Sequence, residues 1–278
     1  MSYSEHGPPV SIATADAAKA RVLQITDPHL MADDSATLLG VRTRDSLNAV
    51  VQAAGALRPA PDLLLATGDL AQDASEAAYH EFGRQVGVFG CPQSWVAGNH
   101  DNSEVLNRVA ARYQATGRHF LLAGWQVILL DSSVQGQVYG RLGQGELRFL
   151  ADALAAFPDR PALISLHHHP VRIDAEWMNA IGLQNRDQFW QVVDRFPQVR
   201  AVLWGHIHQH LDLYRGDVRL LATPSTCIQF QAGSDDFAVE PLAPGFRWLD
   251  LYSDGTLDTG VERATDFQYQ LDTDSNGY

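Results

Sequence analysis

Short apolar runs alternate with amphipathic stretches along the first part of the chain. Val22–Thr26, Leu63–Thr67 and Ser94–Ala97 are short and mostly apolar, which is typical of buried strands. Between them, Thr43–Leu57 and Ser75–Val86 repeat apolar residues at helical spacing. Strands that alternate with helices predict a parallel sheet with the helices packed outside it.

The second half of the chain begins in the same way and then changes character. Val127–Asp131 and Ala162–Leu166 predict strands, and Gly145–Phe157 and Gln184–Phe196 predict helices. Short strands then follow one another at Ala201–Trp204, Leu211–Tyr214, Val218–Ala222, Arg247–Tyr252 and Thr256–Val261, with hairpin turns at Arg215-Gly216-Asp217 and Ser253-Asp254-Gly255. We therefore expect a second, more antiparallel sheet, and an α/β sandwich of two packed mixed sheets flanked by helices.

The length and the local composition predict a single domain. A chain of 278 residues can bury one large core. Residues 1–19 are polar and rich in Pro and Ala, so we expect a flexible leader there. Residues 20–264 would form the domain, and residues 265–278 a C-terminal tail.

The charge balance narrows the choice of partners. The chain has 20 Lys plus Arg against 33 Asp plus Glu, a formal net charge of −13, and such a surface repels nucleic acid and anionic membranes. A small phosphate ester is not excluded, because the charge of bound metal ions would dominate inside a site. We expect a small-molecule substrate, no nucleic acid, no membrane and no required protein partner.

The cysteines and the N-terminus indicate a cytoplasmic protein. Cys91 and Cys227 show no pairing pattern and are expected to be reduced. Residues 1–20 contain neither an apolar run nor a cluster of positive charge, so a signal peptide is not expected. Phe120–Leu130 is too short and interrupted to span a bilayer.

Candidate chemistry is concentrated in five short motifs that combine carboxylate, amide and imidazole side chains. They are Asp27-Pro28-His29, Gly68-Asp69, Gly98-Asn99-His100-Asp101, His167-His168-His169-Pro170 and Gly205-His206-Ile207-His208. Four of them directly follow an apolar run that we interpret as a strand. Ligand sites in α/β sheets favour the carboxyl ends of strands, so we expect the motifs to meet at one edge.

Each motif taken alone has an ordinary structural interpretation. Gly68-Asp69 is common in turns, and Asn99 or Asp101 could cap a following helix. The His triplet could be a surface tract that binds metals nonspecifically. Five such motifs in one chain favour two divalent metals held side by side, and metal pairs of this kind cleave phosphate esters.

The order and content of the motifs resemble the calcineurin-like metallophosphoesterase superfamily. The resemblance runs from Arg21 to about Gln209, and it implies a fold with a dimetal site at the carboxyl edge of the strands. It assigns Asp27, His29 and His208 to one metal, Asn99, His168 and His206 to the other, and Asp69 to both. His168 is chosen within the triplet because the superfamily places its ligand two residues before the proline.

Further segments resemble the bacterial class III 3′,5′-cyclic AMP phosphodiesterases. They include Gln24-Ile25-Thr26-Asp27, Leu38-Leu39-Gly40-Val41, Ala66-Thr67-Gly68-Asp69-Leu70-Ala71-Gln72-Asp73 and Leu221-Ala222-Thr223-Pro224-Ser225-Thr226-Cys227. The resemblance implies hydrolysis of cyclic AMP to 5′-AMP, with Fe²⁺ as the expected metal and Mn²⁺ or Zn²⁺ as alternatives. Two metals that share a water lower its pKa toward roughly 7, so a bridging hydroxide would serve as the nucleophile. A broader small-molecule phosphodiesterase, or a non-catalytic scaffold on the same fold, remains an alternative.

His100 is the candidate catalytic residue, because it follows Asn99 and so must lie at the metal edge. It would stabilise the transition state or protonate the leaving oxygen, although a purely structural histidine is the alternative. Substrate contacts are expected from His29, Asp69, Asn99, His100 and His208. Many superfamily members carry an acid three residues after the bridging Asp, where this chain has Gln72, so Asp73 or Asp101 could instead orient His100. Trp177 or Phe230 could stack on a base, although a role in the core is more common for aromatics.

Overall fold

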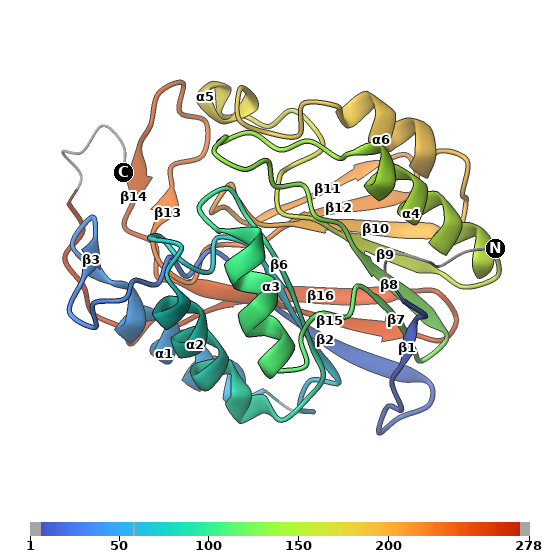
Figure 1. Ribbon diagram of the computed structural model, residues 1–278, viewed down its shortest axis with the longest axis horizontal. Coiled ribbons are helices and arrows are strands. Elements are labelled where there is room, and N and C mark those ends of the chain that lie inside the picture. Colours follow the sequence, from blue (N-terminus) through green and yellow to red (C-terminus); the bar gives the residue numbers. More distant parts are fainter. Residues whose placement is uncertain (1–6, 58, 273–278) are drawn as a thin grey trace.

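The computed structural model describes residues 7–57 and 59–272. Two β-sheets pack face to face, and helices cover the outer face of each sheet (Figure 1). The predicted α/β sandwich of two mixed sheets is confirmed.

The first sheet has five strands. In spatial order they are β16 (Leu257–Arg263), β15 (Gly245–Tyr252), β2 (Lys19–Ile25), β5 (Leu63–Thr67) and β6 (Gln93–Val96). The strands β2, β5 and β6 are parallel, as their alternation with helices predicted. The helices on this side are α1 (Thr43–Gly55), α2 (Glu76–Val86), the short 3₁₀ helix η1 (Gly87–Phe89) and α3 (Ser103–Arg112).

The second sheet has seven strands. In spatial order they are β1 (Val10–Ser11), β7 (His119–Leu122), β8 (Trp125–Leu129), β9 (Ala162–Ser165), β10 (Val199–Trp204), β12 (Val218–Ala222) and β11 (Leu211–Arg215). Its helices are α4 (Gln144–Ala156), α5 (Glu176–Asn179) and α6 (Arg186–Val193). Two small ribbons complete the fold, β3 (Thr37–Leu38) with β4 (Val41–Arg42), and β13 (Gln229–Phe230) with β14 (Val239–Glu240).

The expectation that the second half forms a separate, more antiparallel sheet was wrong in two respects. The strands β8, β9, β10 and β12 run parallel to one another. The hairpin of β15 and β16 belongs to the first sheet, where β15 pairs with β2 from Arg247↔Gln24 to Tyr252↔Lys19. Local sequence predicts the hairpin, but it carries no signal for this pairing across more than two hundred residues.

The apolar residues of the strands form three layers because neighbours on a strand point to opposite faces. Val22 on β2 and Leu203 on β10 lie between the two sheets. Ile25 on β2 faces α1–α3 instead, and Trp204 on β10 faces α4–α6. Because these strands are buried on both faces, their sequences are nearly continuous apolar runs.

The two ends of the chain contribute to the packed body. Strand β1 lies within the predicted leader and pairs with β7 through Val10↔Phe120. In the predicted tail, Phe267 packs against the core, and the Asp272 backbone N–H donates to the Leu39 carbonyl at 2.9 Å. Residues 1–6 and 273–278 lie outside the described residues, and the domain boundaries stay predictions.

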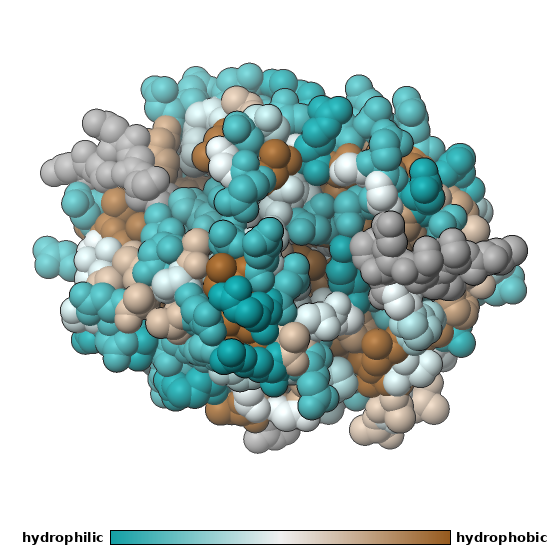
Figure 2. Space-filling view, in the orientation of Figure 1, coloured by the Kyte–Doolittle hydropathy of each residue, from teal (hydrophilic) through white to brown (hydrophobic). Residues whose placement is uncertain are grey.

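The hydrophilic surface and the two unpaired cysteines match what the composition predicted. The face seen in Figure 2 is largely hydrophilic, with apolar residues in separate patches. Cys91 and Cys227 are both free, as expected. No helix within residues 7–57 and 59–272 is long and apolar enough to cross a membrane.

Candidate metal centre and adjoining cavity

The five motifs lie where strands of the two sheets end. Asp27 follows β2, Asp69 follows β5, and Asn99 follows β6, all in the first sheet. The His triplet, which begins at His167, follows β9, and His206 follows β10, both in the second sheet. The site therefore draws on the carboxyl ends of five strands and spans both sheets.

Five candidate ligands have a left-handed backbone, which is uncommon for residues other than glycine. They are Asp27, His29, Asp69, His206 and His208, with φ between 47° and 64°. Such conformations cost of order 1–3 kcal/mol each and persist only where the surroundings hold them. The Asp27 N–H donates to the Gly68 carbonyl and the His29 N–H to the Asp69 carbonyl, both at 3.0 Å. These bonds fix the two loops against each other and turn the ligand side chains toward a common point.

Asp27, His29 and His208 form the first group, with candidate ligand atoms within 4.8 Å of one another. The His29 Nδ1 lies 2.7 Å from the Gln72 Oε1, and the His208 Nδ1 lies 2.9 Å from the Ile228 carbonyl. Each Nδ1 faces an oxygen acceptor and so carries a proton that it donates to that oxygen. The two Nε2 atoms, 3.1 Å apart, then face each other with lone pairs. This arrangement fits a cation, because metal-binding histidines typically donate the other ring N–H to an oxygen.

A second group lies on the other side of Asp69. The His206 Nε2 lies 3.1 Å from the Ile181 carbonyl, which leaves Nδ1 as its candidate ligand atom. The His167 Nδ1 lies 2.8 Å from the Thr67 carbonyl. Its Nε2 lies 3.2 Å from the Asn99 Oδ1 and 3.4 Å from the Asp69 Oδ2. These donors also fit a divalent metal, with Asp69 between the two groups.

The three neighbouring histidines have different surroundings. His167 makes the contacts with Asp69 and Asn99 described above. The His168 Nδ1 lies 2.8 Å from the Ser132 Oγ, while its buried Nε2 has no hydrogen-bond partner within the described residues. The candidate atoms of His167, His168 and His206 lie within 4.8 Å of one another. His167 thus lies against Asp69 and Asn99, whereas His168, which the sequence interpretation named, lies against Ser132.

The protonation states suit metal binding. Burial lowers the pKa of His29 to about 3 and holds those of His168 and His206 well below the ordinary value. These rings are therefore neutral and ready to bind a metal. Burial would also lower the pKa of His167, but the Asp69 carboxylate outweighs it and raises that pKa to about 9. Without a cation, His167 is thus protonated beside Asp69.

The two acids suggested as partners of His100, Asp73 and Asp101, accept hydrogen bonds from backbone N–H groups. The Asp101 carboxylate accepts backbone N–H groups of Leu70, Ala71 and Gly98 at 2.8–3.2 Å, so it joins two metal-site loops. Burial, with the Asp69 charge second, raises the pKa of Asp101 to about 7. Asp73 accepts from the Ala32 and Ser75 backbone N–H groups. These hydrogen bonds tie both acids to the backbone of the loops around the site.

His100 lies at the edge of the metal centre. Its backbone N–H donates to the Asp69 Oδ1 at 2.9 Å, and its ring lies edge-on to the His29 ring with centroids 5.0 Å apart. The following helix α3 is capped by Asn102, so the suggested Asn99 or Asp101 cap was wrong. Gln72 and Ser132 were not recognised as partners of histidines. Ser132 could have been found from its place just after β8 (Trp125–Leu129).

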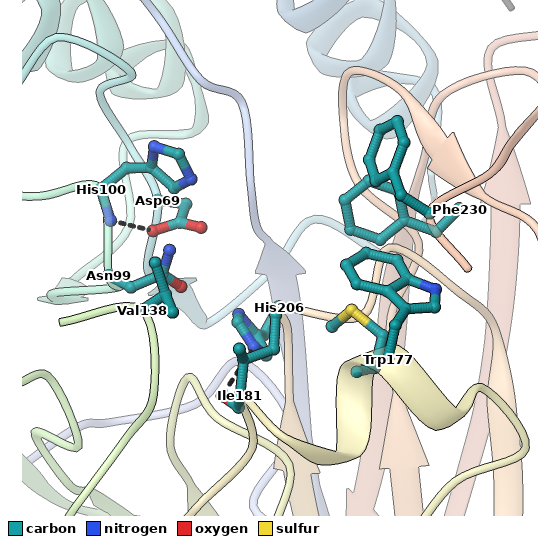
Figure 3. A pocket seen from close by; sticks show the side chains of 10 residues that line it. Asp69, Asn99, His100, Val138, Trp177, Ile181, His206 and Phe230 are labelled. Carbon is teal, nitrogen blue, oxygen red and sulfur yellow. Dashed lines mark hydrogen bonds between the residues drawn. The ribbon is translucent and has the colours of Figure 1, made fainter. Parts of the chain in front are cut away.

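A cavity of about 250 Å³ opens beside the metal centre (Figure 3). Its polar end is lined by Asp69, Asn99, His100 and His206, and its other lining residues are Val138, Trp177, Met178, Ile181, Phe230 and Phe237. The described lining residues include no Lys or Arg, so none of them offers a phosphate a fixed ammonium or guanidinium group. Sequence reasoning named Trp177 and Phe230 as candidates and missed Phe237.

The sequence matches one protein family and, over nearly its whole length, several named relatives. The model of the calcineurin-like phosphoesterase family matches residues 20–210. A protein of Pseudomonas aeruginosa named 3′,5′-cyclic adenosine monophosphate phosphodiesterase CpdA is 44% identical over 94% of this chain and 96% of its own. The protein of the same name from Escherichia coli K12 is 42% identical over 97% and 98%.

Solved structures share the architecture at low sequence identity. A dimetal phosphatase from Danio rerio is 13% identical and superposes with a TM-score of 0.67 over 92% of this chain and 99% of its own. At that identity the similarity supports the fold and nothing more specific.

Proposed function

The chain belongs to the calcineurin-like phosphoesterase family, and from that premise we propose that it hydrolyses 3′,5′-cyclic AMP to 5′-AMP and so lowers the concentration of this second messenger. The observation that carries the substrate is the identity of 42–44%, over nearly the whole chain, to proteins named as cyclic AMP phosphodiesterases. The reaction type is supported by the two groups of metal-binding side chains that meet at Asp69.

In this proposal the protein binds two divalent metals. Asp27, His29 and His208 would hold one ion, and Asp69 would contribute to both. Asn99, His206 and one histidine of the triplet would hold the other, and the contacts with Asn99 and Asp69 favour His167 over the predicted His168. A metal pair of this kind polarises the phosphoryl oxygens and supplies a hydroxide nucleophile at neutral pH.

The remaining residues position the substrate and transfer a proton. His100 would donate its ring proton to the departing 3′ oxygen, because it lines the cavity beside Asp69. General acid catalysis of this kind is typically worth about 10²–10⁴-fold in rate. His29, Asp69, Asn99 and His208 would contact the phosphate through the metals they hold or directly.

Metal identity, location and partners remain predictions. The mixed carboxylate, amide and imidazole donors suit iron, manganese or zinc. We propose Fe²⁺ with Mn²⁺ or Zn²⁺ as substitutes, a cytoplasmic location, and no required protein partner.

The test compares kcat/KM for 3′,5′-cyclic AMP, 2′,3′-cyclic AMP, 3′,5′-cyclic GMP and an aryl phosphodiester after reconstitution with Fe²⁺, Mn²⁺ or Zn²⁺. We expect a preference for 3′,5′-cyclic AMP that is abolished in Asp69→Ala and His206→Ala. Rapid cleavage of the aryl diester without cleavage of cyclic AMP would refute the substrate and leave the metal chemistry in place.

A further inference from the structure

The far side of the cavity is formed by three aromatic side chains that contact one another. Trp177 lies on α5, Phe230 lies on β13, and Phe237 lies between β13 and β14. Their ring centroids are 5.1–5.6 Å apart, and the rings meet edge to face. We call Trp177, Phe230 and Phe237 the aromatic wall.

The aromatic wall is joined directly to the metal centre. The Phe230 ring stacks on the His208 ring with centroids 4.1 Å apart and an interplanar angle of 2°. In Figure 3 the polar residues Asp69, Asn99 and His100 lie across the cavity from Trp177 and Phe230. A molecule whose phosphate occupies the metal end therefore extends toward the wall.

The chemistry of the wall limits what can occupy it. An anionic group would lose its hydration there, because the wall consists of ring faces and edges and its one side-chain polar atom is the Trp177 indole nitrogen. A flat heteroaromatic ring, in contrast, gains stacking and edge-to-face contacts with such side chains. In a cyclic nucleotide the phosphate and the base lie at opposite ends of the ribose, which matches a cavity that is polar at one end and aromatic at the other.

We propose that the aromatic wall is the base-binding subsite of this enzyme, with Trp177 as the residue that most determines preference for a substrate with a base. The proposal rests on the proposed function for its substrate class. Trp177 is the best residue to test, because Phe230 also supports His208 and its removal would disturb the metal centre as well.

The kinetic test uses two substrates, cyclic AMP and ribose 3′,5′-cyclic phosphate that lacks a base. Alanine substitution of a side chain that stacks on a base weakens binding roughly 5- to 150-fold. Trp177→Ala should raise KM for cyclic AMP by a factor in this range, with kcat within about threefold of wild type. It should leave kcat/KM for the baseless substrate unchanged within about threefold, and Trp177→Phe should restore most of the preference.

A control variant separates a local effect from a general one. Tyr214 on β11 is an aromatic residue whose surface is 65% exposed and which does not line the cavity. Tyr214→Ala should match wild type with both substrates. If Trp177→Ala lowers kcat/KM for both substrates equally, Trp177 is only structural and the proposal is wrong.

A binding test gives a readout that needs neither metal nor turnover. Adenosine, which has no phosphate, should show saturation transfer by NMR to its base protons with metal-free wild-type protein and much less with Trp177→Ala. Equal transfer with the two proteins would refute the subsite. If wild type cleaves neither cyclic phosphate, the proposed function fails, and the adenosine experiment still decides whether the aromatic wall binds a base.

Discussion

The hydrogen bond between Gln72 and His29 gives a sharp test of how the metal centre is organised. The Gln72 Oε1 accepts the His29 Nδ1–H at 2.7 Å and so directs Nε2 toward His208. The Gln72 backbone N–H donates to the Leu30 carbonyl at 2.8 Å, and any side chain at this position preserves that bond. Gln72→Ala therefore removes this acceptor while the loop keeps its backbone contact.

The expected magnitude follows from the surroundings. Leaving a buried donor without its acceptor costs about 1–3 kcal/mol. Gln72 is only partly buried, so water can replace part of the lost interaction, and the cost should be about 1–2 kcal/mol. The bond is present without metal too, so this cost lowers the stability of both states, and the loss of metal affinity comes from the poorer orientation and lower basicity of His29. Such outer partners are worth about 10- to 100-fold, and at this partly exposed position we expect roughly 5- to 30-fold.

The assay measures the affinity for Mn²⁺ by calorimetric titration of the metal-free protein. Gln72→Glu is the matched control, because a carboxylate of the same length keeps the acceptor and should bind Mn²⁺ as tightly as wild type or more tightly. At saturating Mn²⁺, kcat of Gln72→Ala should recover to within about threefold. The reasoning is refuted if Gln72→Ala binds Mn²⁺ within twofold of wild type, or if Gln72→Glu loses as much affinity as Gln72→Ala.

Three further predictions concern stability and protons. Burial lowers the pKa of His119 from 6.5 to about 4, so below pH 6.5 the unfolded chain binds a proton that the folded chain does not. Between pH 7.5 and 5 this should lower the unfolding free energy by about 2 kcal/mol in urea titrations, and His119→Leu should remove that loss. Gly140→Ala would place a methyl group against the His168 ring and should cost about 1–3 kcal/mol in thermal unfolding, whereas Gly143→Ala meets open space and should cost less than about 1 kcal/mol, the loss of a glycine at the N-cap of α4. Metal binding at pH 7.5 should release about one proton from His167, whose pKa is about 9. Calorimetry in buffers of different ionisation enthalpy measures the number of protons released, and a number near zero would show that this prediction is wrong.

The sequence predicted that the five motifs meet at one site, because the signals for this are local. A short apolar run marks a buried strand, and polar ligands directly after it must lie at the carboxyl edge of a sheet. Asp27 after β2 and His206 after β10 follow this rule, and their motifs meet in the structure. The parallel order of β2, β5 and β6 was likewise predicted from their alternation with helices.

The missed features depend on distant contacts or on segments too short to show a period. Helix α5 (Glu176–Asn179) spans four residues, so its sequence shows no helical repeat, and the helix that carries Trp177 was not predicted. The choice between His167 and His168 depends on which ring reaches Asn99, a residue that follows a strand of the other sheet. Three consecutive histidines carry no internal signal that distinguishes them.

The precision of the metal centre comes from the packing of the two sheets as much as from its loops. The Asp27 carboxylate, after a strand of the first sheet, accepts the His206 backbone N–H from the second sheet at 3.1 Å to each oxygen. The Asp27 carbonyl accepts the Ser225 hydroxyl at 2.6 Å, and Ser225 follows β12 of the second sheet. Asp27 is thus held by both sheets through backbone and side chain at once. Cross-links of this kind explain how left-handed backbone at Asp27 and His206 can persist, since relaxing either residue would break bonds that join the two sheets.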